Sequence, residues 1–392
     1  MKRILSRDFL ALILSVAVVG LGLGATLPLT ALALTQAGYG TDVVGLMTAM
    51  QAGGGLAVVP LASRVATRFG ARETIVGTVL LVAGATVLMQ FTVNLWLWAV
   101  LRFLCGAALM LLFTIGEAWV TQLADDSTRG RVVAIYATNF TLFQMAGPVL
   151  VSFIGDWQAG RFALCGAIFL FALPALALIR AAPPMHESHE SQDAPANWRH
   201  VLPRMPAIIV GTGFFALFDT LALSLMPLFA MSHGVSPEVA VLFASALLLG
   251  DTTMQFPIGW LADHVGRRRV HIGAAVVVVA LLPLLPWAAA RPWVCWPLLY
   301  VIGAAAGSIY TLSLVACGER FRGAALVSAT SLVGGSWSIA SFGGPMIAGA
   351  LMRQSGPNAL IAVLVASAAA FLFAAGWEAR SERARDTVAR MR

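Results

Sequence analysis

Charged residues are scarce in this 392-residue chain, and lysine is almost absent. Only 11% of the residues are charged, 59% are apolar, and Lys2 is the single lysine. Soluble domains carry about 25% charged residues, so a water-soluble enzyme is excluded. The sequence also lacks a G-x-x-x-x-G-K-[ST] loop, whose lysine would contact nucleotide phosphates, and this excludes ATP-driven transport by this chain alone.

Cysteine is equally rare, and no C-x-x-C pair occurs. The four cysteines lie in or beside apolar runs and are expected to be small packing residues. We therefore expect no metal site and no cofactor. The net charge of +7 is distributed a few residues at a time between apolar runs. This distribution is typical of membrane topology and argues against nucleic-acid binding.

Long apolar runs are what the sequence has in abundance. A run of about 18 or more apolar residues is a candidate membrane helix, and in lipid only helices or closed barrels satisfy every backbone polar group. The runs are too long and too uniform for barrel strands. Twelve spans are predicted, at 8–34, 42–66, 73–92, 96–122, 131–153, 161–180, 206–230, 238–262, 270–290, 293–317, 324–351 and 357–377.

The basic residues predict the orientation of these spans. Of the 25 Lys and Arg residues, all but four fall in segments that share one side of the membrane when both termini lie there. The exceptions are Arg161, Arg291 and Arg353 on the other side and Arg102 within a span. Because cytoplasmic segments carry the excess of Lys and Arg, we expect both termini in the cytoplasm.

A polar stretch divides the chain into two sets of six spans. We expect an N-terminal bundle at 1–180, a cytoplasmic linker at 181–205, and a C-terminal bundle with a short cytoplasmic tail at 206–392. A shift of 196 residues aligns the halves and superimposes Gly38 on Gly234, Gly54 on Gly250 and Gly70 on Gly266. Two homologous six-helix halves are the physical interpretation.

The loop after the eighth span carries a specific motif, Gly259-Trp-Leu-Ala-Asp263-His-Val-Gly266-Arg267-Arg268-Arg269. It resembles the loop signature of the major facilitator superfamily, G-x-L-A-D-r-x-G-r-[RK]-x, on its second site. The first-half copy is degraded, because Ser63 and Thr67 stand where Gly and Asp belong. In that family the loop is thought to latch the outward-open state, which makes Gly259, Asp263, Gly266, Arg267 and Arg268 candidate gating residues. The arginines can equally serve only to anchor topology.

The resemblance implies an all-α membrane protein with 12 transmembrane helices in two pseudo-twofold-related six-helix bundles. It also implies a multi-pass monomer of the bacterial inner membrane that binds a small molecule and protons. Arg102 with Gly106, and Gly147 with Pro148, resemble fragments of further family motifs, and the second pair matches an antiporter element only in part.

Ionisable residues inside spans are costly and default to functional candidates. Asp219, Asp251 and Glu117 are the candidates for proton coupling, and Arg102 is either a partner for a buried carboxylate or a counter-charge for an anionic substrate. By analogy with the family, spans one, four, seven and ten line the central cavity. The alternative for each acid is a structural hydrogen bond or an ion pair. Polar and aromatic candidates for substrate contact, each of which can also be plain packing, are Asn139, Phe143, Gln144, Phe214, Phe218, Tyr310 and Trp337.

These features favour a secondary transporter that exports an amphipathic or drug-like molecule in exchange for protons. The first alternative is proton-coupled uptake of an organic anion, with Arg102 as its counter-charge. The second is a sensor that keeps the fold and has lost transport. No enzymatic activity is expected.

Overall fold

A computed structural model describes residues 7–92, 94–123, 129–154, 160–177 and 198–390, and all regular secondary structure in these ranges is helical. The first half contains α1 (Arg7–Gln36), α2 (Thr41–Val58), η1 (Val59–Leu61), α3 (Ala62–Phe69), α4 (Ala71–Leu88), η2 (Met89–Phe91), α5 (Leu95–Leu123), α6 (Arg129–Ile154), α7 (Arg161–Leu170) and α8 (Ala172–Ala177). The second contains α9 (Trp198–Val201), η3 (Leu202–Arg204), α10 (Pro206–Ser224), α11 (Met226–Ser232), α12 (Pro237–Ala240), α13 (Leu242–Val265), α14 (Arg267–Leu281), η4 (Leu282–Leu284), α15 (Leu285–Ala288), α16 (Pro292–Arg320), α17 (Gly323–Ser355) and α18 (Ala359–Arg390).

These helices coincide with the predicted spans. Eleven helical stretches in the described residues are long and apolar enough to cross a membrane. A shorter apolar stretch, Arg161–Ala177, lies where the sixth span is predicted and is broken at Phe171 between α7 and α8. Residues 178–180, the predicted end of that span, lie outside the described residues.

The internal repeat is visible in the backbone. Gly38 and Gly234 have φ of +86° and +84°, and Gly70 and Gly266 have φ of +87° and +107°. This left-handed region suits glycine because it carries no Cβ. Gly70 ends α3 and Gly266 ends α13, so corresponding glycines form the same turn in both halves.

Close helix packing repeats as well. A Cβ added to Gly54 on α2 would overlap the carbonyl of Phe103 on α5, and one added to Gly250 on α13 would overlap the carbonyl of Tyr300 on α16. Gly106 on α5 and Gly303 on α16 approach the facing helix in the same way. The pairs α2–α5 and α13–α16 are therefore matched units in which small residues bring two backbones together.

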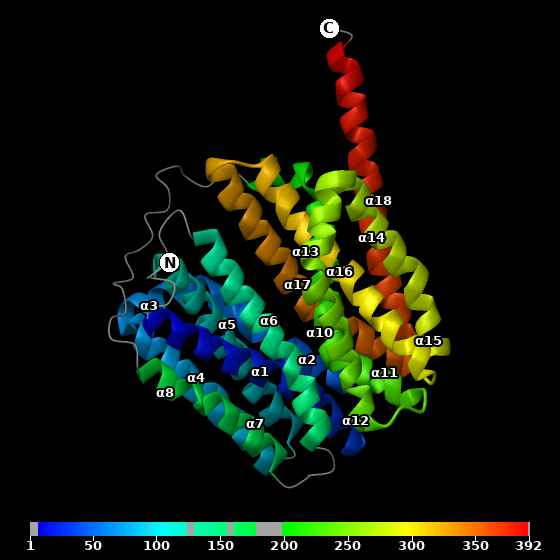
Figure 1. The fold of residues 1–392 in the computed structure, drawn as a ribbon. Coiled ribbons are helices and arrows are strands. Elements are labelled where there is room, and N and C mark those ends of the chain that lie inside the picture. Colours follow the sequence, from blue (N-terminus) through cyan, green and yellow to red (C-terminus); the bar gives the residue numbers. More distant parts are fainter. Residues whose placement is uncertain (1–6, 93, 124–128, 155–159, 178–197, 391–392) are drawn as a thin grey trace.

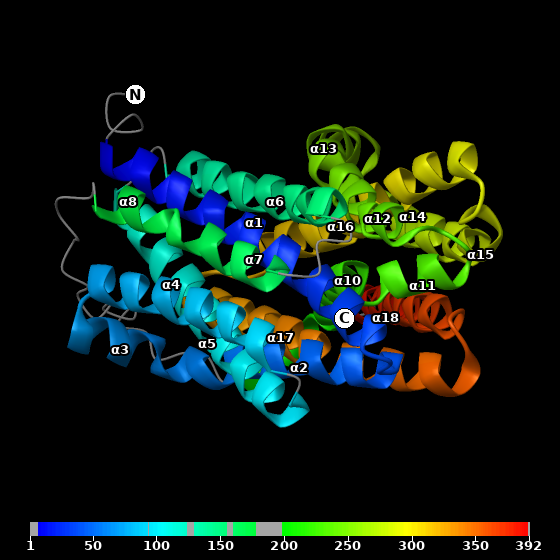
Figure 2. The same cartoon turned by 90° about the horizontal axis from the view of Figure 1, so that it is seen from below.

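We use "basic end" for the end of the molecule where Arg64, Arg68, Arg267–Arg269, Arg320 and Arg322 lie, and "opposite end" for the other. The two bundles meet toward the opposite end, where Thr41 Oγ1 of α2 donates a hydrogen bond to the carbonyl of Gly349 on α17 over 2.9 Å. Ser245 Oγ of α13 likewise donates to the carbonyl of Met145 on α6 over 2.7 Å. Figure 1 shows the N-terminal bundle, blue to green, leaning away from the C-terminal bundle toward the upper side of the view. Figure 2 gives the same helices from below.

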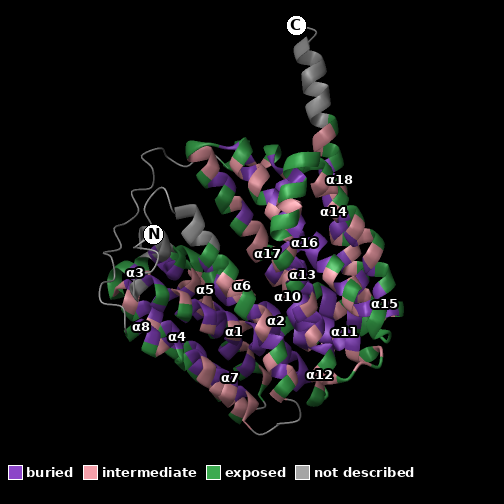
Figure 3. Cartoon of the chain, in the orientation of Figure 1, coloured by how far each residue is buried: buried purple, intermediate pink, exposed green. Residues whose placement is uncertain are grey.

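Two segments differ from a simple linker and tail. Residues 198–204, inside the predicted linker, form α9 and η3, and Val201 and Met205 are buried against Cys317, Phe321, Ala329 and Val333. Residues 181–197 of that linker lie outside the described residues. At the other terminus α18 continues as a helix to Arg390, past the predicted last span. Buried and exposed residues alternate along the helices, as expected where one face of a helix packs on its neighbours and another does not (Figure 3).

Candidate functional site

Three carboxylates from both bundles converge on one region. Glu117 is an exposed residue of α5, Asp219 is half-buried on α10, and Asp251 on α13 is buried, with 6% of its surface exposed. All three lie close enough to the hydroxyl of Tyr310 on α16 to interact with it electrostatically. Asp219 and Asp251 also interact with each other. The three candidates that the sequence places in separate spans therefore share one electrostatic environment.

An aromatic cluster lies beside Asp219 in the C-terminal bundle. The rings of Phe215 and Tyr310 stack with centroids 5.1 Å apart and an interplanar angle of 16°. Trp337 of α17 lies 5.3 Å from Tyr310 and 5.9 Å from Phe215. Phe218 is 6.3 Å from Phe215. Phe215, absent from the predicted set, joins the predicted Tyr310, Trp337 and Phe218. We name Phe215, Tyr310 and Trp337 the C-terminal aromatic wall.

A second aromatic cluster lies in the N-terminal bundle. Phe113 of α5 is 6.0 Å from Tyr136 and 5.3 Å from Phe140, both on α6. The Tyr136 side chain is buried, and its hydroxyl has no hydrogen-bond partner in the described structure. That hydroxyl lies within the electrostatic reach of Glu117. We name Phe113, Tyr136 and Phe140 the N-terminal aromatic wall. Glu117 thus interacts with one tyrosine from each bundle.

Asp251 occupies a position where the two halves differ. A Cβ on Gly307 of α16 would overlap the Asp251 carboxylate, so this glycine makes the space for the acid. The corresponding residues of the N-terminal half are Gly55 on α2 and Met110 on α5. There the glycine is on the first helix of the pair and the larger side chain is on the second, and the Met110 Cβ lies 3.5 Å from a Cβ added to Gly55. Gln255 Nε2 donates to Asp251 Oδ1 over 3.3 Å. The acid is therefore held inside the α13–α16 pair.

Arg102 lies apart from the carboxylates. Its side chain is 2% exposed, and its Nε donates to the carbonyl of Met47 on α2 over 3.5 Å. Its Nη2, like Oε1 of Gln51 on α2, is buried without a hydrogen-bond partner in the described structure. The structure thus places Arg102 between α2 and α5 within the N-terminal bundle, with no ion pair to a described carboxylate.

Other predicted contact residues divide into packed and exposed groups. Asn139 Nδ2 of α6 donates to the carbonyl of Ile13 on α1 over 2.8 Å, so its amide ties two helices of one bundle together. Gln144 is buried, with its backbone against Gly24 of α1, and Phe214 is 2% exposed. Phe143 is 36% exposed. Of these four residues, Phe143 is the most exposed.

The predicted gating loop forms a network within the C-terminal bundle. Arg267 donates to Asp263 Oδ1 from Nη2 over 2.9 Å and from Nε over 3.1 Å, and it also pairs with Glu319 at the end of α16. Arg268 Nη2 donates to the carbonyl of Ala375 on α18 over 3.5 Å. A Cβ added to Gly259 would have no other residue's atom within 4 Å, and Gly266 is the residue at which α13 ends. Glu319 was not among the predicted residues, because nothing in the local motif marks it.

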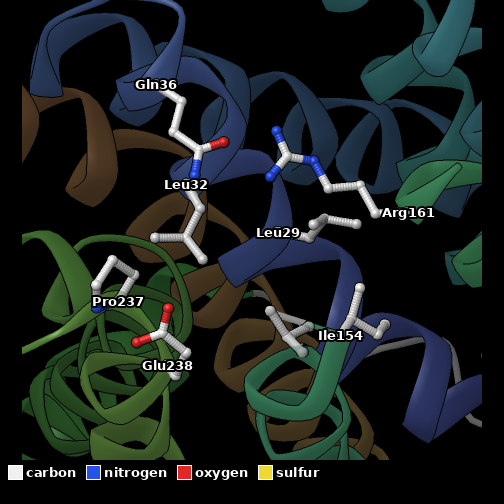
Figure 4. A pocket seen from close by; sticks show the side chains of 8 residues that line it. Leu29, Leu32, Gln36, Ile154, Arg161, Pro237 and Glu238 are labelled. Atoms are coloured by element: carbon white, nitrogen blue, oxygen red, sulfur yellow. The ribbon is translucent and has the colours of Figure 1, made fainter. Parts of the chain in front are cut away.

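A small pocket at the opposite end involves both bundles. It is lined by Leu29, Leu32, Gln36, Val151, Ile154, Arg161, Pro237 and Glu238. In Figure 4 the side chains of Arg161 and Glu238 extend toward this space from different bundles. None of the predicted site residues lines it.

Comparisons with known proteins identify the family. The family model of the Major Facilitator Superfamily matches residues 12–250 and residues 208–391. The chain belongs to the Major Facilitator Superfamily. Its members are transporters and not enzymes, which confirms the predicted fold class and the expectation that the chain is a multi-pass membrane protein without enzymatic activity.

Individual relatives of this superfamily member cover most of its length. The uncharacterized MFS-type transporter YfkF of Bacillus subtilis (strain 168) is 25% identical over 353 residues, 88% of each chain. The uncharacterized MFS-type transporter Ent638_1421 of Enterobacter sp. (strain 638) is 25% identical over 371 residues, 93% of this chain and 94% of the relative.

Solved structures show the same fold. A bacterial homologue of the human lysosomal transporter Spinster, in an inward-facing and unoccupied conformation, has a TM-score of 0.74 at 16% identity, over 96% of both chains. The nucleoside transporter NupG has a TM-score of 0.74 at 14% identity, over 96% of this chain and 99% of that one.

Proposed function

We propose that this transporter is a proton-coupled exporter that moves a small amphipathic molecule out of a bacterial cell by alternating access. The observation that carries the proposal is that three acids from both bundles, Glu117, Asp219 and Asp251, lie in helices that are long and apolar enough to cross a membrane. Sites between the repeats of secondary transporters lie near the bilayer midplane. Ionisable side chains at that depth are energetically costly, so an acid there is a candidate for a functional group.

Asp219 is the proposed proton carrier. It is half-buried, and no described residue donates a hydrogen bond to its carboxylate or pairs with it. Because desolvation penalises the charged form of an acid, a carboxyl beside aromatic rings and a second carboxylate can take up a proton and release it. A proton shifts the equilibrium between two orientations only if it binds one of them more tightly. Protonation that removes the repulsion between Asp219 and Asp251 supplies such a difference.

The direction of transport rests on the orientation of the chain. From the positive-inside rule we infer that the basic end faces the cytoplasm, together with both termini. The bundles are joined toward the opposite end by the Thr41–Gly349 and Ser245–Met145 hydrogen bonds. This arrangement supports a state that receives its substrate from the cytoplasm, as an exporter requires.

Uptake of an organic anion is the weaker alternative. It requires a counter-charge for the anion, and Arg102, the basic candidate, is 2% exposed between α2 and α5.

A vesicle experiment tests the proposal. A thermal-shift screen of the purified chain against metabolites and antibiotics first finds a ligand, because a compound that binds only the folded state raises its stability. Inverted vesicles with an acidified lumen are then given that ligand. We expect ligand-dependent efflux of protons from the lumen. Proton movement in the same direction as the ligand would indicate symport, and absence of any flux would support the sensor.

Replacing Asp263 by Asn should slow the transport cycle without abolishing ligand binding. The substitution removes the negative charge of the group that accepts both Arg267 hydrogen bonds. Because the side chains of Asp263 and Arg267 are 59% and 44% exposed, water screens the pair, and its loss should change the stability of the fold little. Turnover in vesicles and ligand affinity should be measured together. An unchanged turnover rate would show that the loop only anchors topology.

A further inference from the structure

We propose that two charge pairs, Asp42 with Arg353 and Glu238 with Arg161, hold the opposite end of the transporter closed. Each pair joins one bundle to the other, since Asp42 is on α2 and Arg353 on α17, while Glu238 is on α12 and Arg161 on α7. We name them the opposite-end pairs. The inference goes beyond the proposed function, because it depends neither on the substrate nor on coupling to protons.

Arginines are rare on this side of the chain. Arg161, Arg291 and Arg353 are the three that the sequence predicts there, against the usual excess of basic residues on the cytoplasmic side. Each therefore needs a local reason. Arg291 has one beside its own helix: its guanidinium carbon lies 4.5 Å from the ring centroid of Trp287, and Nη1 donates to the Trp287 carbonyl. For the other two arginines, the neighbouring group of opposite charge belongs to the other bundle.

The packing of α2 on α17 brings Arg353 to the start of α2. A Cβ added to Gly45 would overlap the carbonyl of Pro345. One turn further along α17, a Cβ added to Gly349 would overlap the carbonyl of Thr41. The two helices therefore run antiparallel, and each turn of α17 meets the preceding turn of α2. The next turn of α17 carries Arg353, which falls beside the residues that precede α2.

Asp42 and Arg353 are neighbours in the structure. Asp42 Oδ1 and Arg353 Nη1 both lie within 3.0 Å of the point at which a Cβ on Gly40 would stand. Both residues are exposed, so the two charges meet at the surface of the molecule. Because the arginine side chain is long and flexible, a small change of rotamer brings the guanidinium onto the carboxylate.

Glu238 and Arg161 line one pocket between the bundles. Val151 and Ile154 of α6 and Pro237 of α12 form part of the same lining. Figure 4 shows the Glu238 and Arg161 side chains extending toward this space from the two bundles. Both residues are half-buried. An acid of one bundle and a base of the other thus share one small space at the seam, where opposite charges attract.

The internal repeat relates the two acids but not the two arginines. The shift of 196 residues that aligns the halves places Asp42 on Glu238, and each acid lies in the first turn of its helix. Arg353 lies in the last turn of α17, whereas Arg161 begins α7. The two halves thus reach the same charge arrangement from positions that do not align. Descent from one ancestral half does not explain both arginines, and a shared requirement at the two seams does.

Contacts between the bundles at one end stabilise the state in which that end is closed. Opening separates each acid from its arginine, so the pairs bias the equilibrium toward closure. Solvent-exposed ion pairs are weak, and each is expected to change the ratio of closed to open molecules by about two- to fivefold. Salt screens exposed charges. The pairs therefore make closure of the opposite end sensitive to ionic strength while leaving it easy to reverse.

Labelling of a single cysteine tests the opposite-end pairs. The cysteine replaces Tyr310 in a chain without the four native cysteines, and a membrane-impermeant thiol reagent is added to sealed vesicles from the opposite end. We expect Asp42→Asn and Glu238→Gln each to raise the labelling rate about two- to fivefold, and the two together about tenfold. Asp42→Arg should raise it more than Asp42→Asn, because two arginines then repel. Adding Arg353→Asp to Asp42→Arg should restore slow labelling.

Arg291→Gln is the matched control, since Arg291 is the third arginine of this side and contacts Trp287. It should label like the chain with all charges intact. Thermal unfolding of each variant verifies that it is folded. A salt series needs no charge variant: labelling of the chain with both pairs intact should rise between about 0.01 M and about 1 M salt. The combined Asp42→Asn and Glu238→Gln variant should lose most of this rise.

Three results would overturn the inference. They are unchanged labelling in the combined variant, equal labelling of Asp42→Arg with and without Arg353→Asp, and labelling of the intact chain that does not respond to salt. These measurements involve neither substrate nor protons. Their failure would leave the proposed function standing, and absence of proton exchange in the vesicle experiment would leave the opposite-end pairs standing.

Discussion

Replacing Asp219 by Asn is expected to abolish proton-coupled transport, while the protein still folds and inserts into the membrane. Asparagine has nearly the same shape but cannot bind a proton at neutral pH. Asp219 has no hydrogen bond or ion pair to a described residue that the change would break. Loss of its charge should therefore not destabilise the bundle. The measurement is ligand-dependent movement of protons in vesicles, with expression and thermal unfolding followed in parallel.

Glu73→Gln is the matched control, since Glu73 is an exposed acid at the start of α4. It should couple like the wild type. Wild-type coupling in Asp219→Asn would refute the assignment and leave Asp251 or Glu117 as the proton carrier. Asp251→Asn distinguishes these two, because Asp251 is buried against Gly307 and Glu117 is not.

Replacing Gly349 by Val should open the opposite end of the transporter and nearly stop its cycle. A Cβ at Gly349 would overlap the carbonyl of Thr41 and lie 3.2 Å from the Cα of Gly45, both on α2. It would also disturb the Thr41–Gly349 hydrogen bond of 2.9 Å. Overpacking costs about 1–3 kcal/mol. Because the cost falls only on the state in which α2 and α17 are in contact, the population of that state should fall about tenfold or more.

Accessibility to a membrane-impermeant thiol reagent measures this shift. A cysteine replaces Tyr310 in a background without the four native cysteines, and the reagent is added from the opposite end. Labelling should rise in Gly349→Val. Gly343→Val on the same helix is the control, since a Cβ there meets no atom within 4 Å. Equal labelling in both variants would show that the α2–α17 contact does not hold the opposite end closed.

The sequence predicts the helices well because lipid leaves few choices. An apolar run must form a helix, and the predicted run 293–317 lies within α16, at Pro292–Arg320. The repeat is equally readable, since Gly70 and Gly266 hold the same left-handed conformation. Loops and turns carry such signals because apolar composition alone cannot produce them.

The site is less predictable because hydropathy does not show which way a side chain points. Arg102 and Glu117 lie on one helix and were both expected in the cavity, yet one is buried against α2 and the other is exposed. Asn139 bonds to its own bundle. Phe215 gave no signal apart from its phenylalanine neighbours. Which face of a helix meets a partner, and which faces the other bundle, depends on contacts that are distant in sequence.

The larger side chain of each matched pair lies on a different helix: Met110 is on α5, the second helix of its pair, and Asp251 is on α13, the first helix of its pair. This difference bears on how the two halves diverged. If both halves descend from one duplicated gene, a larger residue on one helix was compensated by a glycine on the facing helix. In the first half Gly55 faces Met110, and in the second half Gly307 faces Asp251. Covariation of positions 251 and 307 among descendants is expected from this reciprocity. Divergence has placed a carboxylate between the two helices of only one of these matched pairs, so the transporter is symmetric in architecture but holds this buried acid in one half.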